Sequence, residues 1–359
     1  MSVLLFLMSI GVVNIISAVA IEALRFSVQP IIPENQIEES SWFDLLVDPG
    51  ELQILSILVT NIADEEIVLI PEIAQGTTTP FGTSVFTPNH APLDESVLYA
   101  ATDLLRVPEY LVVPALATAT LEIELQMPLD EFDGMIAAGI TISEQEGIVE
   151  EIDVEGVSLG GNQAGMALEN RFRFNIAILI RNNLSGIAPL LNLTSAAAGQ
   201  SNFRNVIHAY LQNPQPRFLS HVEIHAEVTE RHTGAVFVRG AIAEPGAQFA
   251  PSSTMQFPIP LNGLPFEAGE YTMRIRAISP DEEWDLAYDF EITAEEAQRL
   301  NAEDVTLELD GFPWGMMLIG LALLLFVLVS FLILLLNRKR AAMYDEVAYE
   351  DEYDAYEDD

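Results

Sequence analysis

Between Phe26 and Ser143, apolar and polar residues alternate over short runs that glycine and proline separate. Leu52 to Thr60 and Leu121 to Met127 show the two-residue period of half-buried strands, and Met135 to Ser143 is a further run of this kind. No apolar pattern of helical period extends far in this region. Strands of this length with frequent turn residues predict an antiparallel β-sandwich over residues 24–146.

The same pattern returns after residue 170. The segment from Glu267 to Tyr271 resembles the turn before a late strand that Ig-like domains brace with a tyrosine. Thr293 and Glu296 have capping-box spacing and predict a short helix over 294–301. A second Ig-like sandwich is therefore expected over 170–306. Its predicted strands lie near Val206 to Leu211, His221 to Thr229, Thr254 to Ile259, Tyr271 to Ile278 and Asp285 to Thr293.

The connection between the two predicted domains is acidic and then rich in glycine over residues 147–169, which is typical of a linker or a long loop. A strong strand pattern follows from Phe172 to Ile180. This strand either begins the second domain or closes the first sandwich, as a last strand over 171–181 that pairs with Met135 to Ser143. The pattern leaves both placements open.

Residues 1–20 form an apolar run that ends in Ala18-Val19-Ala20, the small-x-small pattern of signal peptidase sites. We expect a signal peptide that is removed after Ala20. No Lys or Arg precedes the run, so an uncleaved membrane anchor is the alternative.

A second apolar run, Met316 to Leu336, has 21 residues without a charge. At about 1.5 Å per residue it spans the roughly 30 Å hydrocarbon core of a bilayer, which predicts one transmembrane helix over 315–336. Trp314 suits the outer interface, and Arg338-Lys339-Arg340 follows the inner end as the positive-inside rule requires. The prediction is a single-pass protein of the cell membrane, with its N-terminus outside and an acidic cytoplasmic tail over 337–359.

Acidic residues dominate the chain, because 54 Asp and Glu stand against 15 Lys and Arg for a formal net charge of -39. Lys339 is the only lysine, and it lies on the predicted cytoplasmic side. Arginine keeps its charge where lysine titrates, and a dense carboxylate surface stays hydrated in salt, so we hypothesise an alkaline or saline habitat. The acidic balance excludes nucleic acid as a natural partner.

Few residues suit catalysis or metal binding. The chain has no cysteine, and the absence of lysine from the predicted exterior excludes Schiff-base and Ser-Lys chemistry. His221 and His225 have the spacing of a helical zinc site, but on a strand they stand about 13 Å apart. No GxSxG elbow supports a serine triad. We therefore expect a protein that is not an enzyme and that has neither a cofactor nor a metal.

Aromatic side chains near turns are the candidate binding residues, because flat rings stack on the apolar faces of a sugar. Nearby amides and carboxylates would bond the sugar hydroxyls. The alternative for most of these aromatic residues is a place in the core. The candidates in the first domain are Trp42, Phe43, Phe81, Phe86 and Tyr99.

Short motifs occur along both predicted domains in a specific order and spacing. In the first they include Pro33-Glu34-Asn35-Gln36, Phe43-Asp44-Leu45 and Met127-Pro128 before Phe132-Asp133-Gly134. In the second they include Asn170-Arg171-Phe172, Leu211-Gln212-Asn213-Pro214 and the run from Leu261 to Tyr271. Together they resemble the WxL-interacting protein family of Gram-positive cell surfaces.

The resemblance covers nearly the whole predicted exterior and implies a peptidoglycan-binding domain, a second domain described as host-binding, and a C-terminal membrane helix. It implies a protein within the cell wall that binds peptidoglycan and recruits WxL-domain proteins, and it assigns no site residue. The alternatives are an adhesin that binds a host matrix protein through the second domain and, from a different class, a cell-wall hydrolase. Family members are usually rich in lysine, so this acidic exterior disfavours attachment to anionic wall polymers by charge.

Overall fold

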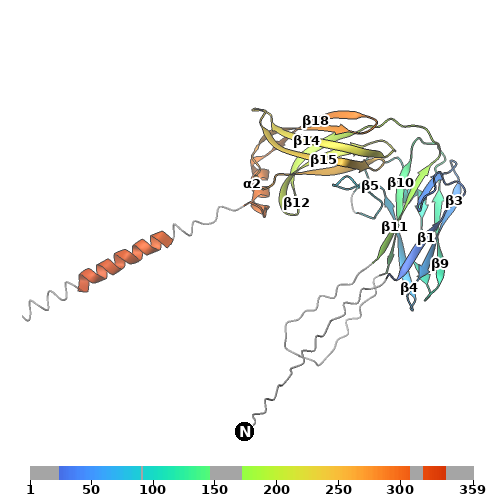
Figure 1. Ribbon diagram of the computed structural model, residues 1–359, viewed down its shortest axis with the longest axis horizontal. Coiled ribbons are helices and arrows are strands. Elements are labelled where there is room, and N and C mark those ends of the chain that lie inside the picture. The colour runs from blue at the N-terminus through green and yellow to red at the C-terminus, as the bar shows by residue number, and fades with distance from the viewer. Residues whose placement is uncertain (1–23, 90–91, 146–171, 308–317, 337–359) are drawn as a thin grey trace, which may run out of the picture.

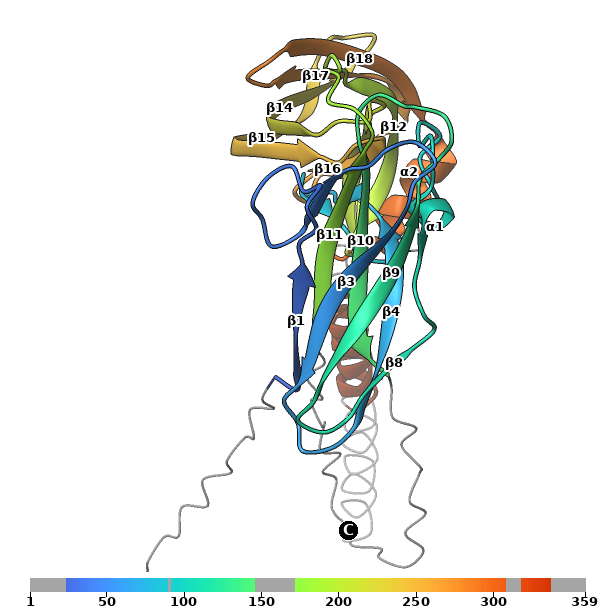
Figure 2. The same cartoon turned by 90° about the vertical axis from the view of Figure 1, so that its right-hand side faces the viewer.

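The computed structural model describes residues 24–89, 92–145, 172–307 and 318–336. The predicted signal peptide, the linker 147–169 and the cytoplasmic tail lie outside these residues. The described chain forms two β-sandwiches in tandem, followed by an apolar helix (Figures 1 and 2). The fold class that the sequence predicts is thereby confirmed.

The first sandwich consists of a four-stranded and a five-stranded sheet. The four-stranded sheet contains, in spatial order, β1 (Phe26–Ile31), β3 (Leu52–Asn61), β9 (Thr118–Gln126) and β7 (Leu105–Arg106). The five-stranded sheet contains β2 (Phe43–Leu46), β11 (Arg173–Arg181), β10 (Ile136–Glu144), β4 (Ile67–Gln75) and β8 (Leu111–Val113). A short hairpin of β5 (Thr77–Thr78) and β6 (Ser84–Val85), and the single turn α1 (Ala101–Leu104), lie between β4 and β7.

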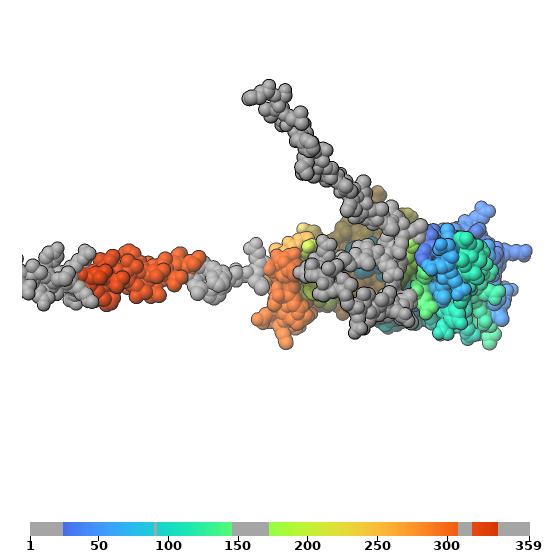
Figure 3. Space-filling view, turned by 90° about the horizontal axis from the view of Figure 1, so that it is seen from below, coloured from blue at the N-terminus to red at the C-terminus, as the bar shows by residue number. Residues whose placement is uncertain are grey.

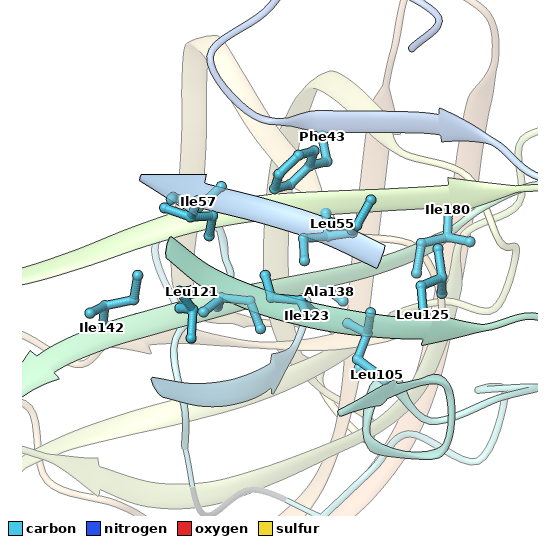
Figure 4. Packing of buried hydrophobic residues seen from close by; sticks show 14 of the residues in the cluster. Phe43, Leu55, Ile57, Leu105, Leu121, Ile123, Leu125, Ala138, Ile142 and Ile180 are labelled. Atoms are coloured by element: carbon cyan, nitrogen blue, oxygen red, sulfur yellow. The ribbon is translucent and has the colours of Figure 1, made fainter. Parts of the chain in front are cut away.

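The core of this sandwich comes from the alternate residues that each strand points between the sheets (Figure 4). In the β3–β9 pair, Leu55 lies opposite Ile123 and Ile57 lies opposite Leu121, and all four are buried. Full burial of such a side chain contributes about 1.5–3 kcal/mol. The alternation seen in the sequence is therefore the inward face of these strands.

β11 belongs to the first sandwich, where it lies between β2 and β10. It pairs with β10 antiparallel and with β2 in parallel, and its residues Ile176, Ile178 and Ile180 are buried. The carboxylate of Asp44 on β2 accepts a charge-assisted hydrogen bond from the guanidinium of Arg181 at the end of β11. Of the two placements that the sequence leaves open, the structure therefore has the one in which this strand completes the first sandwich.

The second sandwich consists of a three-stranded and a four-stranded sheet, all antiparallel. The three-stranded sheet contains, in spatial order, β12 (Asn192–Ser201), β13 (Arg204–Asn213) and β16 (Ser253–Pro260). The four-stranded sheet contains β15 (Val236–Phe249), β14 (Leu219–Glu230), β17 (Gly269–Ile278) and β18 (Glu283–Ile292). Two of these strands, β12 and β15, are absent from the sequence-based prediction.

Two local predictions in the second sandwich are confirmed. The buried Tyr271 donates its hydroxyl to the carbonyl of Glu267 at 2.9 Å and so braces the turn before β17. Thr293 accepts a hydrogen bond from the amide of Glu296 at 3.2 Å and caps α2 (Ala294–Glu303), which extends two residues beyond the predicted end.

The apolar helix Leu318–Leu336 is 19 residues long with a mean hydropathy of 3.2, and none of its most apolar window is buried. At about 1.5 Å per residue it is nearly as long as a bilayer core is thick. Length and composition are thus sufficient for one membrane span. The space-filling view shows this helix and α2 on one side of the second sandwich and the first sandwich on the other (Figure 3).

Candidate functional site

The first sandwich extends the β5–β6 hairpin onto the second. The carbonyl of Gly82, in the turn of the hairpin, accepts a hydrogen bond from the amide of Gln248 at 2.8 Å, and Ser84 Oγ donates to the carbonyl of Gln248 at 3.1 Å. Gly82 has a φ of +73°, and a Cβ on it would lie 2.5 Å from the Cβ of Ala247. Glycine is therefore the residue that lets this turn approach the second sandwich.

Hydroxyl groups connect the base of the hairpin to the segment before β16. Thr78 Oγ1 accepts from the amide of Ala250 at 2.9 Å and lies 2.7 Å from Ser253 Oγ, which donates to the carbonyl of Ala250 at 2.8 Å. Ser253 has one hydroxyl proton, so Thr78 is the donor in the bond between the two hydroxyls. Both side chains are buried and satisfied, so this contact is a built part of the fold.

Asp94 forms a second bridge between the sandwiches. Its Oδ1 accepts hydrogen bonds from Ser96 Oγ at 2.6 Å and from Gln212 Nε2 at 2.8 Å, and its Oδ2 accepts one from Thr254 Oγ1 at 2.5 Å. Burial alone would raise the pKa of Asp94, but the hydrogen bonds from Ser96, Thr254 and Gln212 lower this pKa below its ordinary value. At neutral pH the carboxylate is ionised and holds β13 and β16 of the second sandwich.

A third contact joins the turn before β10 to the segment before β14. The amide of Met135 donates to the carbonyl of Pro216 at 2.8 Å, and a Cβ on Gly134 would lie 2.3 Å from that same oxygen. Nearby, the rings of Phe86 and Phe218 meet edge to face with centroids 6.5 Å apart. The two sandwiches therefore meet over several separate segments.

A pocket of about 570 Å³ lies at this junction, between the hairpin, the segment before α1 and residues 252–254. That volume falls within the range of small-ligand sites, about 300–1,000 Å³. Asp94 is the one charged residue among the described residues that line it, and its oxygens are already bonded to Ser96, Gln212 and Thr254. Threonines and apolar side chains form much of the remaining wall, so the pocket suits an uncharged ligand with both apolar and hydroxyl-bearing faces.

The five aromatic candidates are distributed between the core and the surface. Phe43 is fully buried in the core of the first sandwich, and Tyr99 packs against that core with its ring 5.7 Å from that of Phe132. Phe86 lies over β10, and a Cβ added to Gly139 on that strand would lie 2.5 Å from the Cβ of Phe86. Trp42 and Phe81 are exposed, at 45% and 81%.

The structure does not gather these five side chains into one site. Phe81, Phe86 and Tyr99 come from the segment between β5 and α1, whereas Trp42 and Phe43 lie at β2, on an edge of the five-stranded sheet. The two exposed rings, Trp42 and Phe81, are the ones that a ligand can reach without a change in the core. The interface candidates Trp314, Arg338, Lys339 and Arg340 lie outside the described residues.

Metal-binding geometry is not found in the part of the chain that the structure describes. No group of three or more His, Cys, Asp or Glu side chains there could hold a metal ion. His225 is exposed beside Glu223, at 3.9 Å, and His221 lies at a backbone irregularity near the start of β14 with a φ of +57°. His208 is half-buried, and burial lowers its pKa.

The residues that build the junction are absent from the sequence-based candidates. Thr78, Asp94, Gln248 and Ser253 have no periodicity or motif that marks them, and the motif that contains Gln212, Leu211-Gln212-Asn213-Pro214, assigns it no role. Their partners lie more than a hundred residues away in several cases, such as Thr78 and Ser253, which are 175 residues apart. The available signal was the dense run of Thr, Pro and Gly over 77–83, which indicates a turn but not the surface on which it packs.

Two family models match the chain. The model "WxL Interacting Protein, peptidoglycan binding domain" matches residues 26–144, and the model "WxL Interacting Protein, host binding domain" matches residues 163–302. The second match includes β11, although this strand pairs within the first sandwich. Among curated proteins, none matches the chain.

Solved structures with a similar chain course include bacterial chaperones. The CupB2 chaperone of Pseudomonas aeruginosa is 14% identical, with 69% of this chain and 96% of that chain covered and a TM-score of 0.27. The CsuC-CsuE chaperone-tip adhesion subunit complex of Acinetobacter baumannii is 10% identical, with 65% of this chain and 90% of that chain covered and a TM-score of 0.30.

Proposed function

This chain belongs to the WxL-interacting protein family, and from that membership we propose a membrane-anchored surface protein that binds peptidoglycan and recruits WxL-domain proteins to the cell wall. The two matched family models are described as a peptidoglycan binding domain and a host binding domain. The single observation that carries the proposal is the order of the chain, in which a wall-binding sandwich and a second binding sandwich precede an apolar helix long enough to span a membrane.

Anchoring by residues 315–336 is supported by the length and apolar character of the described helix. The proposed placement of the two sandwiches outside rests on the positive-inside rule and the basic run Arg338-Lys339-Arg340 in the sequence. An exposed, strongly apolar helix of 19 residues is costly in water, whereas a bilayer accommodates it. The proposed location is the cell membrane, with the sandwiches reaching into the wall.

A binding role is supported by the way the junction satisfies its polar groups. The carboxylate of Asp94 and the hydroxyls of Thr78 and Ser253 are committed to hydrogen bonds between the sandwiches. Both hydroxyl protons are used in these hydrogen bonds, and the carboxylate is tied to two strands of the second sandwich, which favours a structural role for these groups. The junction therefore fixes two binding surfaces relative to each other.

We propose that neutral glycan, and not the anionic wall polymers, is the ligand of the first sandwich. A chain with a net charge of -39 repels anionic polymers at close range, although repulsion is screened beyond about 8 Å at physiological salt. The exposed rings of Trp42 and Phe81 can stack on sugar faces, and the junction pocket offers hydroxyl groups and apolar walls.

The test is binding of residues 21–310 to insoluble cell wall and, separately, to a secreted WxL-domain protein. Both should retain the fragment, and the substitutions Trp42→Ala and Phe81→Ala should weaken retention on wall. Tyr110→Ala is the matched control, since Tyr110 is an aromatic residue of the first sandwich with a similar exposure of 56%. Failure to bind wall or WxL protein, or lysis of the wall in a zymogram, would contradict the proposal.

A host-binding role is the second candidate, and the match of residues 163–302 to a host binding domain is the observation that favours it. In that case the second sandwich acts as an adhesin for a host matrix protein. Binding of immobilised collagen or fibronectin through the second sandwich, with no retention of the chain by WxL protein, would favour this candidate.

A further inference from the structure

The turn between β12 and β13 contains Phe203, whose backbone conformation is strained and whose apolar side chain is exposed to water. Asn202 and Phe203 have φ values of +51° and +57°, as a two-residue hairpin turn of the I′ type requires. Asn suits the first of these positions, but the second favours glycine, because a side chain there is strained. Phe203 is nonetheless 70% exposed, so burial of its ring does not offset the backbone strain.

Two further apolar side chains are exposed at the same end of the second sandwich. Val305 is 69% exposed, and its amide donates to the carbonyl of Phe203 at 3.0 Å. Leu264 is 49% exposed, in the loop after β16 that α2 holds through two hydrogen bonds between Asn301 and Phe266. We call Phe203, Leu264 and Val305 the apolar tip.

Buried polar contacts hold the apolar tip rigidly. The amide of Asn205 donates to Asp304 Oδ2 at 2.7 Å, and Asn205 Nδ2 donates to Asn301 Oδ1 at 2.9 Å. Burial alone would raise the pKa of Asp304, but hydrogen bonds from Thr306, Asn205 and Leu307 lower it below its ordinary value. The three apolar side chains are therefore presented by a fixed framework of turn, loop and helix end.

The position of the apolar tip points to its partner. α2 lies at the end of the second sandwich that faces away from the first (Figures 1 and 3). The apolar helix begins at Leu318, eleven residues after Leu307, and eleven residues reach at most roughly 38 Å even when fully extended. The exposed Arg204 follows Phe203 directly and offers a cation for lipid phosphate.

We propose that the apolar tip inserts into the outer interface of the bilayer that holds the apolar helix, with Phe203 as its deepest side chain, and so fixes the tilt of the two sandwiches above the membrane. This proposal rests on the proposed membrane anchor. Apolar and aromatic groups of such surfaces enter about 5–10 Å into the boundary between headgroups and acyl chains. The framework would then transmit the orientation of the membrane to the first sandwich through the junction.

The absence of cysteine from the chain allows one label to be placed at a time. The full chain is reconstituted into vesicles of phosphatidylglycerol and phosphatidylcholine as Phe203→Cys, Phe326→Cys or Leu129→Cys, each carrying an environment-sensitive dye. Phe326 lies in the apolar helix, and Leu129 is 87% exposed on the first sandwich, so they report the anchor and a surface distant from it. Spin-labelled lipids with a shallow or a deep nitroxide then quench the dye by depth.

The expected result is strong quenching at 203 by the shallow nitroxide with a blue-shifted emission, quenching at 326 by the deep one, and neither effect at 129. Quenching at 326 with position 203 behaving like 129 would overturn the inference and leave the anchor intact. Absence of quenching at all three positions would refute the anchor itself, and the inference with it. A label at 203 that shifts only when a WxL-domain protein is added would also overturn the inference, in favour of a protein partner.

A second measurement separates contact with membrane from a role in folding. Phe203→Gly should raise the midpoint of thermal unfolding, because it relieves the strained turn. It should also broaden the distribution of energy-transfer efficiencies between a dye at 129 and acceptor lipids, because the tilt of the sandwiches is then no longer fixed. A lower unfolding midpoint would show that Phe203 serves the fold, and an unchanged distribution would show that it does not orient the sandwiches. Either result would overturn the inference.

Discussion

The two sandwiches balance their charges differently. With β11 counted in the first sandwich, residues 24–182 carry 26 acidic residues and 5 arginines, whereas residues 183–307 carry 16 acidic residues and 7 arginines. On the second sandwich arginines stand beside acids, as where Arg239 lies directly opposite Glu227 at 2.7 Å, or where Arg276 meets Glu283 at 2.9 Å. Each exposed pair contributes little by itself, but together they cancel repulsion that the first sandwich retains.

The sandwiches also differ in where their strands come from. The strands of the second follow one another from Asn192 to Ile292, but the first needs β11, which the chain supplies only after residues 146–171. The match to the peptidoglycan binding domain ends at residue 144, before that strand. The limits of the sequence family and of the folded unit therefore differ, and a fragment must follow the folded unit.

The largest expected effect is the loss of β11. A fragment of residues 24–145 lacks the three buried isoleucines of this strand, whose burial contributes roughly 5–9 kcal/mol, comparable to the whole stability of a domain. It should show no cooperative thermal unfolding by circular dichroism. A fragment of residues 24–182 is the control and should unfold cooperatively. Cooperative unfolding of the shorter fragment would show that β11 is dispensable.

The next effect is the weakening of the junction by Asp94→Asn. An amide cannot accept every hydrogen bond that the carboxylate accepts from Ser96, Gln212 and Thr254, so docking should weaken by about 1–3 kcal/mol. Faster hydrogen exchange at the amides of Gln248 and Ala250 measures this opening. Glu95→Gln is the matched control, because Glu95 is the exposed acidic neighbour.

The same variant has a defined pH dependence. The folded pKa of Asp94 lies below its ordinary value of 3.8, so its carboxylate stabilises the junction above that value, and this stabilisation is lost as the pH falls through the lowered pKa. The wild-type junction should open in acid, while the Asn variant should already be weakened at neutral pH and change less. Equal acid sensitivity of both proteins would assign the effect to other groups.

A smaller effect is expected from Tyr271→Phe in the second sandwich. The carbonyl of Glu267 loses its donor while the ring is kept, which should cost about 1 kcal/mol. Burial, with the charges of Glu267 and Glu230, raises the pKa of Tyr271 above 10.0, so the neutral phenol stabilises the fold below that pH and loses this contribution as the pH rises through the folded pKa.

The deficit of the Phe variant should therefore shrink in strong alkali, as measured by urea unfolding at neutral pH and above pH 10.0. Tyr288→Phe is the control, since Tyr288 is 36% exposed on β18. A deficit that stays constant up to the alkaline limit would show that the phenol does not titrate with folding. If it shrinks, the phenol sets an upper limit on the alkaline tolerance hypothesised from the sequence.

Strands with a regular apolar period were predictable, and those without one were not. Leu52 to Thr60 predicts β3 to within one residue, since its alternate residues face the core. β12 was missed because it is rich in Ala, Ser and Gly, and β15 because Gly240, Pro245 and Gly246 interrupt it and its register with β14 shifts. In these strands the pairing with neighbours determines the conformation, and the local sequence does not show it.

The candidate site was less predictable than the fold for a related physical reason. A buried ring and an exposed ring next to a turn have the same local sequence signal, so Phe43 in the core and Phe81 on the hairpin could not be told apart. The contacts of Asp94 and Thr78 arise from how two domains dock. Docking depends on surfaces that exist only after both domains have folded.

The smallest expected effect, and the direct test of the contrast in charge, is the response of each sandwich to salt. Raising a chloride salt to about 0.15 M shortens the screening length to about 8 Å and weakens both repulsion and attraction between exposed charges. The first sandwich, as residues 24–182, should gain stability because its net repulsion falls. The second sandwich, as residues 183–307, should change little or lose stability, because pairs such as Arg239 with Glu227 are weakened at the same time.

Differences of a few tenths to about 1 kcal/mol are expected, and urea unfolding of both fragments over the same salt series measures them. Sucrose at matched osmolality is the control, because it strengthens burial without screening charge. The charge reversal Arg239→Glu should make the stability of the second sandwich respond to salt like that of the first, since the attraction between residues 239 and 227 becomes a repulsion. Equal gains for both fragments would show that the salt acts through burial in general, and the contrast in charge would then have no consequence for stability.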